Sequence, residues 1–120
     1  MISKTIVTAV NRWLDDAVSG MYKDQPMAQD WARVAKVGEE YGEAIAELIL
    51  LTGQNPRKGI DPFAYNRMLN ELADVALTAV FAIQHFTEDA DNTASIIAAR
   101  EEHVMMRVPA RNGQSDSANK

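Results

Sequence analysis

The sequence has 120 residues, of which 47% are hydrophobic and 24% charged, and its formal net charge is −5. This length supports about one domain with a real core, and the negative charge disfavours binding to nucleic acid or to an anionic membrane. Cysteine is absent, which excludes disulfides, thiolate metal ligands and thiol nucleophiles. The longest apolar run is far shorter than the ~18 residues of a membrane span, and polar residues interrupt the amino-terminal run before a signal-peptide core can form. We therefore expect a soluble cytoplasmic protein.

Two helices are predicted in the first half of the chain. Apolar residues recur at helical spacing from Ile2 to Val18, and Gly20 is expected to end this first helix. A second helix is expected to begin at Pro26 or Met27, because proline is tolerated in a first turn. Its apolar residues alternate three and four apart until Gly53, where the helix is predicted to stop.

The second half of the chain predicts a loop and two further helices. Residues 52–62 are rich in glycine, asparagine and proline, which is typical of a loop, and they contain a small basic cluster. A third helix is expected from Asp61, a good capping residue, to about Phe86. A fourth is expected from residue 91 or 92 to about Arg107.

The expected fold is all-α, because no strand pattern competes with these helices. We expect one helical domain at residues 1–108 and a polar, disordered tail at residues 109–120. The third predicted helix is apolar on too many sides for three partner helices of a small monomer to cover. A four-helix bundle completed by oligomerisation is therefore expected.

An acidic residue interrupts the apolar part of the third predicted helix. Between Leu72 and Ile83 every residue is apolar except Asp74 and Thr78. An ionised carboxylate without a partner in an apolar interior costs several kcal/mol. The neighbour of Asp74 on the same helix face is Glu71, which is another acid, so a compensating charge has to come from outside this helix.

The second predicted helix supplies another pair of acids, Glu40 and Glu43, three residues apart beside the core stripe. Two antiparallel helices bring this pair against Glu71 and Asp74. Each like-charged pair at ~5 Å is unfavourable by roughly 3 kcal/mol, so the cluster requires a cation. Oxygen ligands without cysteine or histidine favour Mg²⁺ first and Mn²⁺ second, and such sites commonly complete their shell with substrate phosphates.

The alternative interpretation is that these acids form a solvated helix face. For Glu39 and Glu47 taken alone that interpretation is favoured, because most glutamates on surface helices need no special explanation. For Asp74 it is weak, because of the apolar residues around it.

Two sequence motifs resemble those of a known family. "EEYGE" at residues 39–43 and "ELAD" at residues 71–74 resemble the EExxE and ExxD motifs of the MazG-like, all-α nucleotide pyrophosphohydrolases. The loop "TGQNPRKG" is similar to the linker of the short, single-domain members found in actinobacteria and their phages. The resemblance covers roughly residues 30 to 107.

The resemblance implies hydrolysis of a nucleoside triphosphate to the monophosphate and pyrophosphate. It implies that Glu39 activates water and that relatives form homodimers or homotetramers. It also implies the ligands of Mg²⁺, which are Glu40, Glu43, Glu71 and Asp74. A carboxylate beside the metal ligands is well suited to deprotonate the attacking water, while the metal neutralises developing charge.

Several other residues are candidates for binding phosphate or base. Lys36 either reaches a phosphate or pairs with an acid one turn away. Trp31 either stacks on a base or packs in the core, and the second role is favoured. The remaining phosphate candidates are Arg57 and Lys58 in the loop, for which a solubilising role is nearly as good an interpretation, and Arg100 and Arg107 in the last helix.

The last helix also departs from the family pattern. Relatives often carry a Lys-x-x-x-Asn-x-x-Arg-Tyr-Pro stretch, whereas this chain has Val104 where asparagine is usual. The alternative function is therefore a catalytically silent protein that binds a nucleotide or a partner protein through the same bundle. A metal-stabilised structural oligomer is a third hypothesis.

Overall fold

The computed structural model describes residues 2–22 and 24–109, which form four α-helices and contain no strand. The helices are α1 (Lys4–Tyr22), α2 (Pro26–Thr52), α3 (Ala64–Thr87) and α4 (Ala90–Met106). The all-α prediction is therefore confirmed. The tail predicted at residues 109–120 lies outside the described residues except for Pro109, so the division at residue 108 stays a prediction. No helix in the described part of the chain combines the length and hydropathy that a membrane crossing requires.

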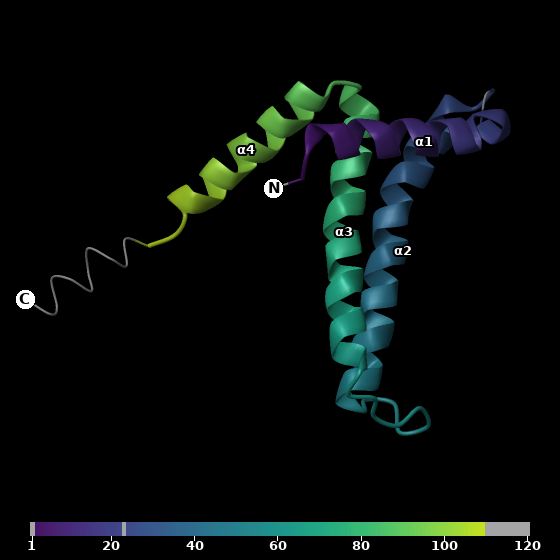
Figure 1. The fold of residues 1–120 in the computed structure, drawn as a ribbon, viewed down its shortest axis with the longest axis vertical. Coiled ribbons are helices and arrows are strands. Elements are labelled where there is room, and N and C mark those ends of the chain that lie inside the picture. Colours follow the sequence, from purple (N-terminus) through teal and green to yellow (C-terminus); the bar gives the residue numbers. More distant parts are fainter. Residues whose placement is uncertain (1, 23, 110–120) are drawn as a thin grey trace, which may run out of the picture.

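The helices are arranged as an open hairpin with two flanking elements (Figure 1). α2 and α3 lie side by side in antiparallel directions along their lengths, α1 crosses this pair near one end, and α4 leads away from the same end. The radius of gyration is 19.3 Å, against about 13 to 14 Å for a compact chain of this length. The single chain is thus far more extended than a closed bundle.

The predicted ends of α2 and the start of α4 agree with the structure to within a residue or so. α2 begins at Pro26 and ends before Gly53, which adopts a left-handed conformation with φ 69°. A Cβ atom at Gly53 would lie 2.5 Å from Cγ1 of Ile60, so both the turn and the close approach favour glycine. Asp89 caps α4, because its Oδ1 accepts a hydrogen bond from the Asp91 N–H at 2.9 Å.

Two other helix ends differ from the prediction. α1 continues through Gly20 to Tyr22, so the predicted stop at Gly20 is wrong. A single glycine weakens a helix by about 1 kcal/mol and need not break it. α3 begins at Ala64, later than predicted, because Asp61 belongs to a turn in which its Oδ1 accepts a hydrogen bond from the Phe63 N–H at 3.0 Å.

The apolar core of the single chain is small. Its buried apolar residues are Val7, Ala44, Ala64 and Ala82, and no large side chain among the described residues is fully buried. Leu69 and Leu77 of α3 are 43% and 37% exposed. Successive helical residues are 100° apart, so both leucines lie about 140° around α3 from the buried alanines. The face of α3 directed away from the core is therefore apolar and uncovered.

A buried arginine joins α1 to the hairpin. Arg33 of α2 is 8% exposed, and its Nη2 donates hydrogen bonds to the side-chain oxygen of Asn11 in α1 and to the carbonyl oxygen of Phe81 in α3. Burial lowers the pKa of Arg33, and the nearby Asp15 opposes that shift. One side chain of α2 therefore contacts both α1 and α3 where the three helices meet.

A second polar cluster fixes the corner between α3 and α4. Thr93 is 2% exposed, and its hydroxyl donates to Oε1 of Gln84 at 2.7 Å and lies 2.7 Å from the hydroxyl of Thr87. Gln84 is itself only 4% exposed. Its side-chain oxygen depends on Thr93, because a buried acceptor without a donor is costly.

Replacing Thr93 by valine should therefore destabilise the protein while keeping its shape. We expect a loss of about 1 to 2 kcal/mol, because the oxygen of Gln84 loses its donor in a buried place. Thermal unfolding measures this loss as a lower melting temperature. The same substitution at Thr8, an exposed residue of α1, is the matched control and should change stability by less than about 0.5 kcal/mol. Equal melting temperatures for the two variants would contradict the role of the buried hydroxyl.

Candidate metal centre

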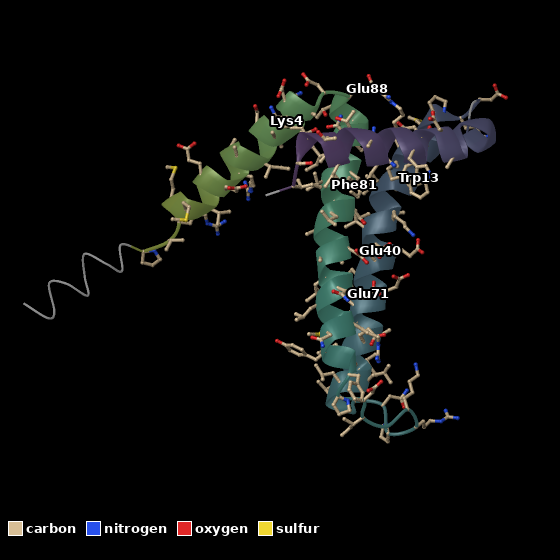
Figure 2. All side chains as sticks on the ribbon, in the orientation of Figure 1. Lys4, Trp13, Glu40, Glu71, Phe81 and Glu88 are labelled. Carbon is tan, nitrogen blue, oxygen red and sulfur yellow. The ribbon has the colours of Figure 1, made fainter. Side chains whose placement is uncertain are left out.

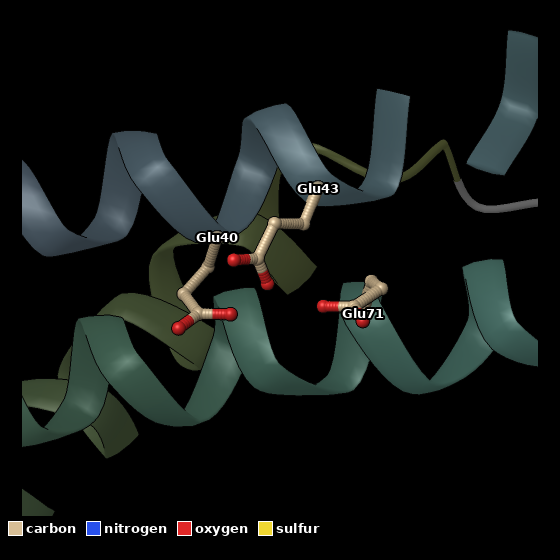
Figure 3. A group of neighbouring side chains, drawn as sticks. All are labelled: Glu40, Glu43 and Glu71. Carbon is tan, nitrogen blue, oxygen red and sulfur yellow. The ribbon is translucent and has the colours of Figure 1, made fainter. Parts of the chain in front are cut away.

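Three glutamates converge between α2 and α3, about midway along the hairpin (Figures 2 and 3). Glu40 and Glu43 come from α2 and Glu71 comes from α3. Each offers one carboxylate oxygen, and these three oxygens all lie within 4.8 Å of one another. Glu40 and Glu71 are half-buried, whereas Glu43 is exposed. The antiparallel pairing of the two helices, as expected from the sequence, brings these three of the four predicted ligands together.

One oxygen of this cluster lacks a partner. Oε2 of Glu71 is buried and accepts no hydrogen bond. A buried carboxylate oxygen without a donor or a cation costs free energy, and here two further carboxylates add repulsion of roughly 3 kcal/mol per pair at ~5 Å and an effective dielectric of 20. The unpartnered oxygen and the all-oxygen donor set both fit a hard divalent cation such as Mg²⁺ or Mn²⁺.

Asp74 does not join the cluster in the single chain. Its side chain is exposed, so the prediction that Asp74 lies in a buried environment is wrong for this chain. Asp74 follows Glu71 by three positions and is therefore displaced by about 60° around α3. Several of the apolar residues that flank it in the chain are exposed as well, such as Leu72 and Leu77. The assignment of Asp74 as a metal ligand stays a prediction.

Glu39 lies beside the cluster without belonging to it. Its side chain is 59% exposed, and its Oε1 lies 3.1 Å from Nζ of Lys36. The same ammonium lies 3.5 Å from Oε1 of Glu40. The hydrogen bond with Glu39 is the largest of the effects that raise the pKa of Lys36, followed by the charge of Glu39 and then by the interactions with Glu40. Lys36 thus pairs with both neighbouring acids, one of the two roles considered for it.

The other predicted cations lie away from the cluster in the single chain. Arg57 and Lys58 are exposed in the loop at the far end of the hairpin (Figure 1). The loop follows the end of α2 at Thr52, which lies about 13 Å along the helix from Glu43 at a rise of 1.5 Å per residue. Arg100 and Arg107 belong to α4 and the turn that follows it, which lead away from the hairpin.

Trp31 does not lie where the favoured interpretation places it. The sequence favours packing in the core, but this residue is 77% exposed near the start of α2. Core packing is therefore wrong for Trp31 in the single chain. The alternative of stacking on a base stays a prediction.

The sequence does not predict a group of ion pairs that keeps one further glutamate out of the acidic cluster. Nε of Arg67 lies 2.8 Å from Oε2 of Glu47, and its Nη2 lies 2.8 Å from Oδ2 of Asp61. The bond to Arg67 is the main cause that lowers the pKa of Asp61. Glu47 follows Glu43 by one turn but is occupied by Arg67, so it takes no part in the acidic cluster. These residues are too far apart in the sequence to form a local pattern that predicts the ion pairs.

Comparisons with family models, with curated proteins and with solved structures find no match. The interpretation of this centre therefore depends on its own residues and their geometry.

Proposed function

We propose that this protein is a Mg²⁺-dependent nucleoside triphosphate pyrophosphohydrolase of the MazG-like type. The observation that carries the proposal is the convergence of Glu40, Glu43 and Glu71 around the unpartnered buried oxygen of Glu71. Like charges at this spacing are unfavourable without a cation, and carboxylate-bound Mg²⁺ commonly completes its shell with water and phosphate oxygens. The motifs "EEYGE" and "ELAD" connect such a site to nucleotide hydrolysis.

The side chains have distinct roles in this proposal. Glu40, Glu43 and Glu71 hold the cation, and Asp74 is the fourth ligand once the site is assembled. When bound, the cation neutralises charge on the phosphates. Glu39 is the general base, because its exposed carboxylate adjoins Glu40 and is available to accept a proton from the attacking water. Lys36 is the nearest cation for a phosphate oxygen.

We further propose that the bundle is completed by other copies of the chain, as a homodimer or a homotetramer. The support is the small core, the radius of gyration of 19.3 Å and the uncovered leucines of α3. A monomer with so little buried apolar surface has too little to offset its conformational entropy. Assembly also offers a route for Arg100 and Arg107 to reach the cluster, because α4 is directed away from the hairpin of its own chain.

The activity can be tested by a screen of common and modified dNTPs with Mg²⁺ or Mn²⁺. Pyrophosphate is measured by a coupled assay and the nucleoside monophosphate by chromatography. The proposal predicts equal amounts of both products from at least one substrate and none in EDTA. No turnover with any nucleotide would contradict it.

A silent, nucleotide-binding or protein-binding oligomer is the second candidate. It is favoured by the position of Lys36 as the one predicted phosphate-binding cation that, among the described residues, pairs with the acids of the site. Val104 at the place of the family asparagine points the same way. This candidate predicts that nucleotides raise the melting temperature without release of pyrophosphate.

A further inference from the structure

The acidic cluster already has a positive group bound to one of its members. Nζ of Lys36 lies 3.5 Å from Oε1 of Glu40 and 3.1 Å from Oε1 of Glu39. The side chain of Glu40 is only 14% exposed, whereas that of Lys36 is 48% exposed. No other basic side chain in the described part of the chain forms an ion pair with the acids of the cluster.

This ammonium and a divalent cation compete for the same carboxylate. Mg²⁺ binds carboxylate oxygens at 2.0 to 2.1 Å. A cation held by Glu40 therefore lies within a few ångströms of the present position of Nζ, and the two positive charges repel each other. Lysine has a flexible four-carbon stem and a compact charge, so it can leave Glu40 without any movement of the helix.

We propose that Lys36 is a built-in counter-ion, which competes with the divalent cation for Glu40 and is released by that cation to bind a phosphate of the nucleotide. This inference depends on the proposed function, and it adds a mechanism that couples the binding of the cation to the binding of the nucleotide. Without nucleotide, Lys36 weakens cation binding. With nucleotide, the displaced ammonium gains a phosphate partner, so the cation and the triphosphate bind best together.

The reciprocal nature of binding linkage gives the proposal a second consequence. If the cation releases Lys36 for the phosphates, the cation has to raise nucleotide affinity, and the nucleotide has to raise cation affinity by the same factor. Removing the ammonium must therefore reduce the factor by which the cation and the nucleotide raise each other's affinity. A lysine that serves only to solubilise α2 has no such effect.

The test uses calorimetric titration of the full chain with Mn²⁺ alone and then with a non-hydrolysable α,β-imido dNTP in saturating Mn²⁺. Lys36→Met should bind Mn²⁺ alone about 5- to 10-fold more tightly than the unmodified protein. An exposed ion pair changes an equilibrium constant by up to about fivefold, and the repulsion between the ammonium and a divalent cation is stronger than that between two single charges. The same variant should bind the nucleotide at least about fivefold more weakly. Lys36→Arg keeps the charge and should resemble the unmodified protein in Mn²⁺ affinity.

The matched control is Lys4→Met, which removes an exposed lysine at the start of α1, away from the cluster (Figure 2), and should alter neither affinity. Unchanged Mn²⁺ affinity in Lys36→Met, with Mn²⁺ binding intact in the unmodified protein, overturns the counter-ion role and leaves the proposed function in place. If the unmodified protein itself binds no Mn²⁺, both fall together.

Discussion

Glu71→Gln is expected to weaken Mn²⁺ binding at least ~100-fold and to reduce pyrophosphate release by a similar factor. Substituting a residue that only orients a metal ligand typically lowers metal affinity or activity 10- to 100-fold. Substituting a ligand itself should lower them at least as much. Glu71 supplies the one buried oxygen of the cluster that lacks a partner. Calorimetric titration with Mn²⁺ and the pyrophosphate assay measure the two effects.

The same substitution should have the opposite effect on stability when no metal is present. Glutamine removes one of three carboxylates whose oxygens lie within 4.8 Å, and with it the repulsion between them. In EDTA we therefore expect Glu71→Gln to melt at a higher temperature than the unmodified protein, by roughly 1 kcal/mol of added stability. Loss of metal binding together with gain of stability is the pattern of a functional site.

The control for both measurements is Glu102→Gln, which changes an exposed glutamate of α4 that forms no ion pair with any described residue. It should leave Mn²⁺ affinity and melting temperature unchanged. If Glu71→Gln behaves like this control, the acids are a solvated helix face and the proposal of a metal centre is wrong.

Leu69→Glu is expected to dissociate the proposed oligomer and to unfold much of the protein. Leu69 is 43% exposed in the single chain, on the uncovered face of α3. If that face packs against another copy, each leucine contributes about 1.5 to 3 kcal/mol and a buried glutamate adds the cost of an unpaired charge. Light scattering after size-exclusion chromatography gives the mass, and circular dichroism gives the remaining helix.

The matched control for the second prediction is Asn92→Glu, which places the same new charge at an exposed polar position of α4. It should keep both the mass and the melting temperature of the unmodified protein. A monomeric unmodified protein that unfolds cooperatively, together with a harmless Leu69→Glu, would refute assembly through α3.

The acidic cluster illustrates what sequence reasoning can and cannot achieve. The sequence predicts that Glu40 and Glu43 meet Glu71. The two glutamates of α2 share one helix face, and neighbouring antiparallel helices bring such faces together. The same reasoning does not hold for Asp74, because apolar neighbours in the sequence do not by themselves establish burial. Several of those neighbours, such as Leu72 and Leu77, are exposed, and the sequence does not distinguish an apolar face that is buried in the chain from one that is left uncovered.

The sequence by itself determined the four helices, most of their ends and the sharing of helix faces by the acids. These features are local, since periodicity, a glycine at Gly53 and a cap at Asp89 act within a few residues. Only the tertiary structure decided that α4 leads away from the hairpin, that Arg67 occupies Glu47 and that one oxygen of Glu71 is left without a partner. These depend on contacts between residues far apart in the chain, whose geometry is set by how the helices pack.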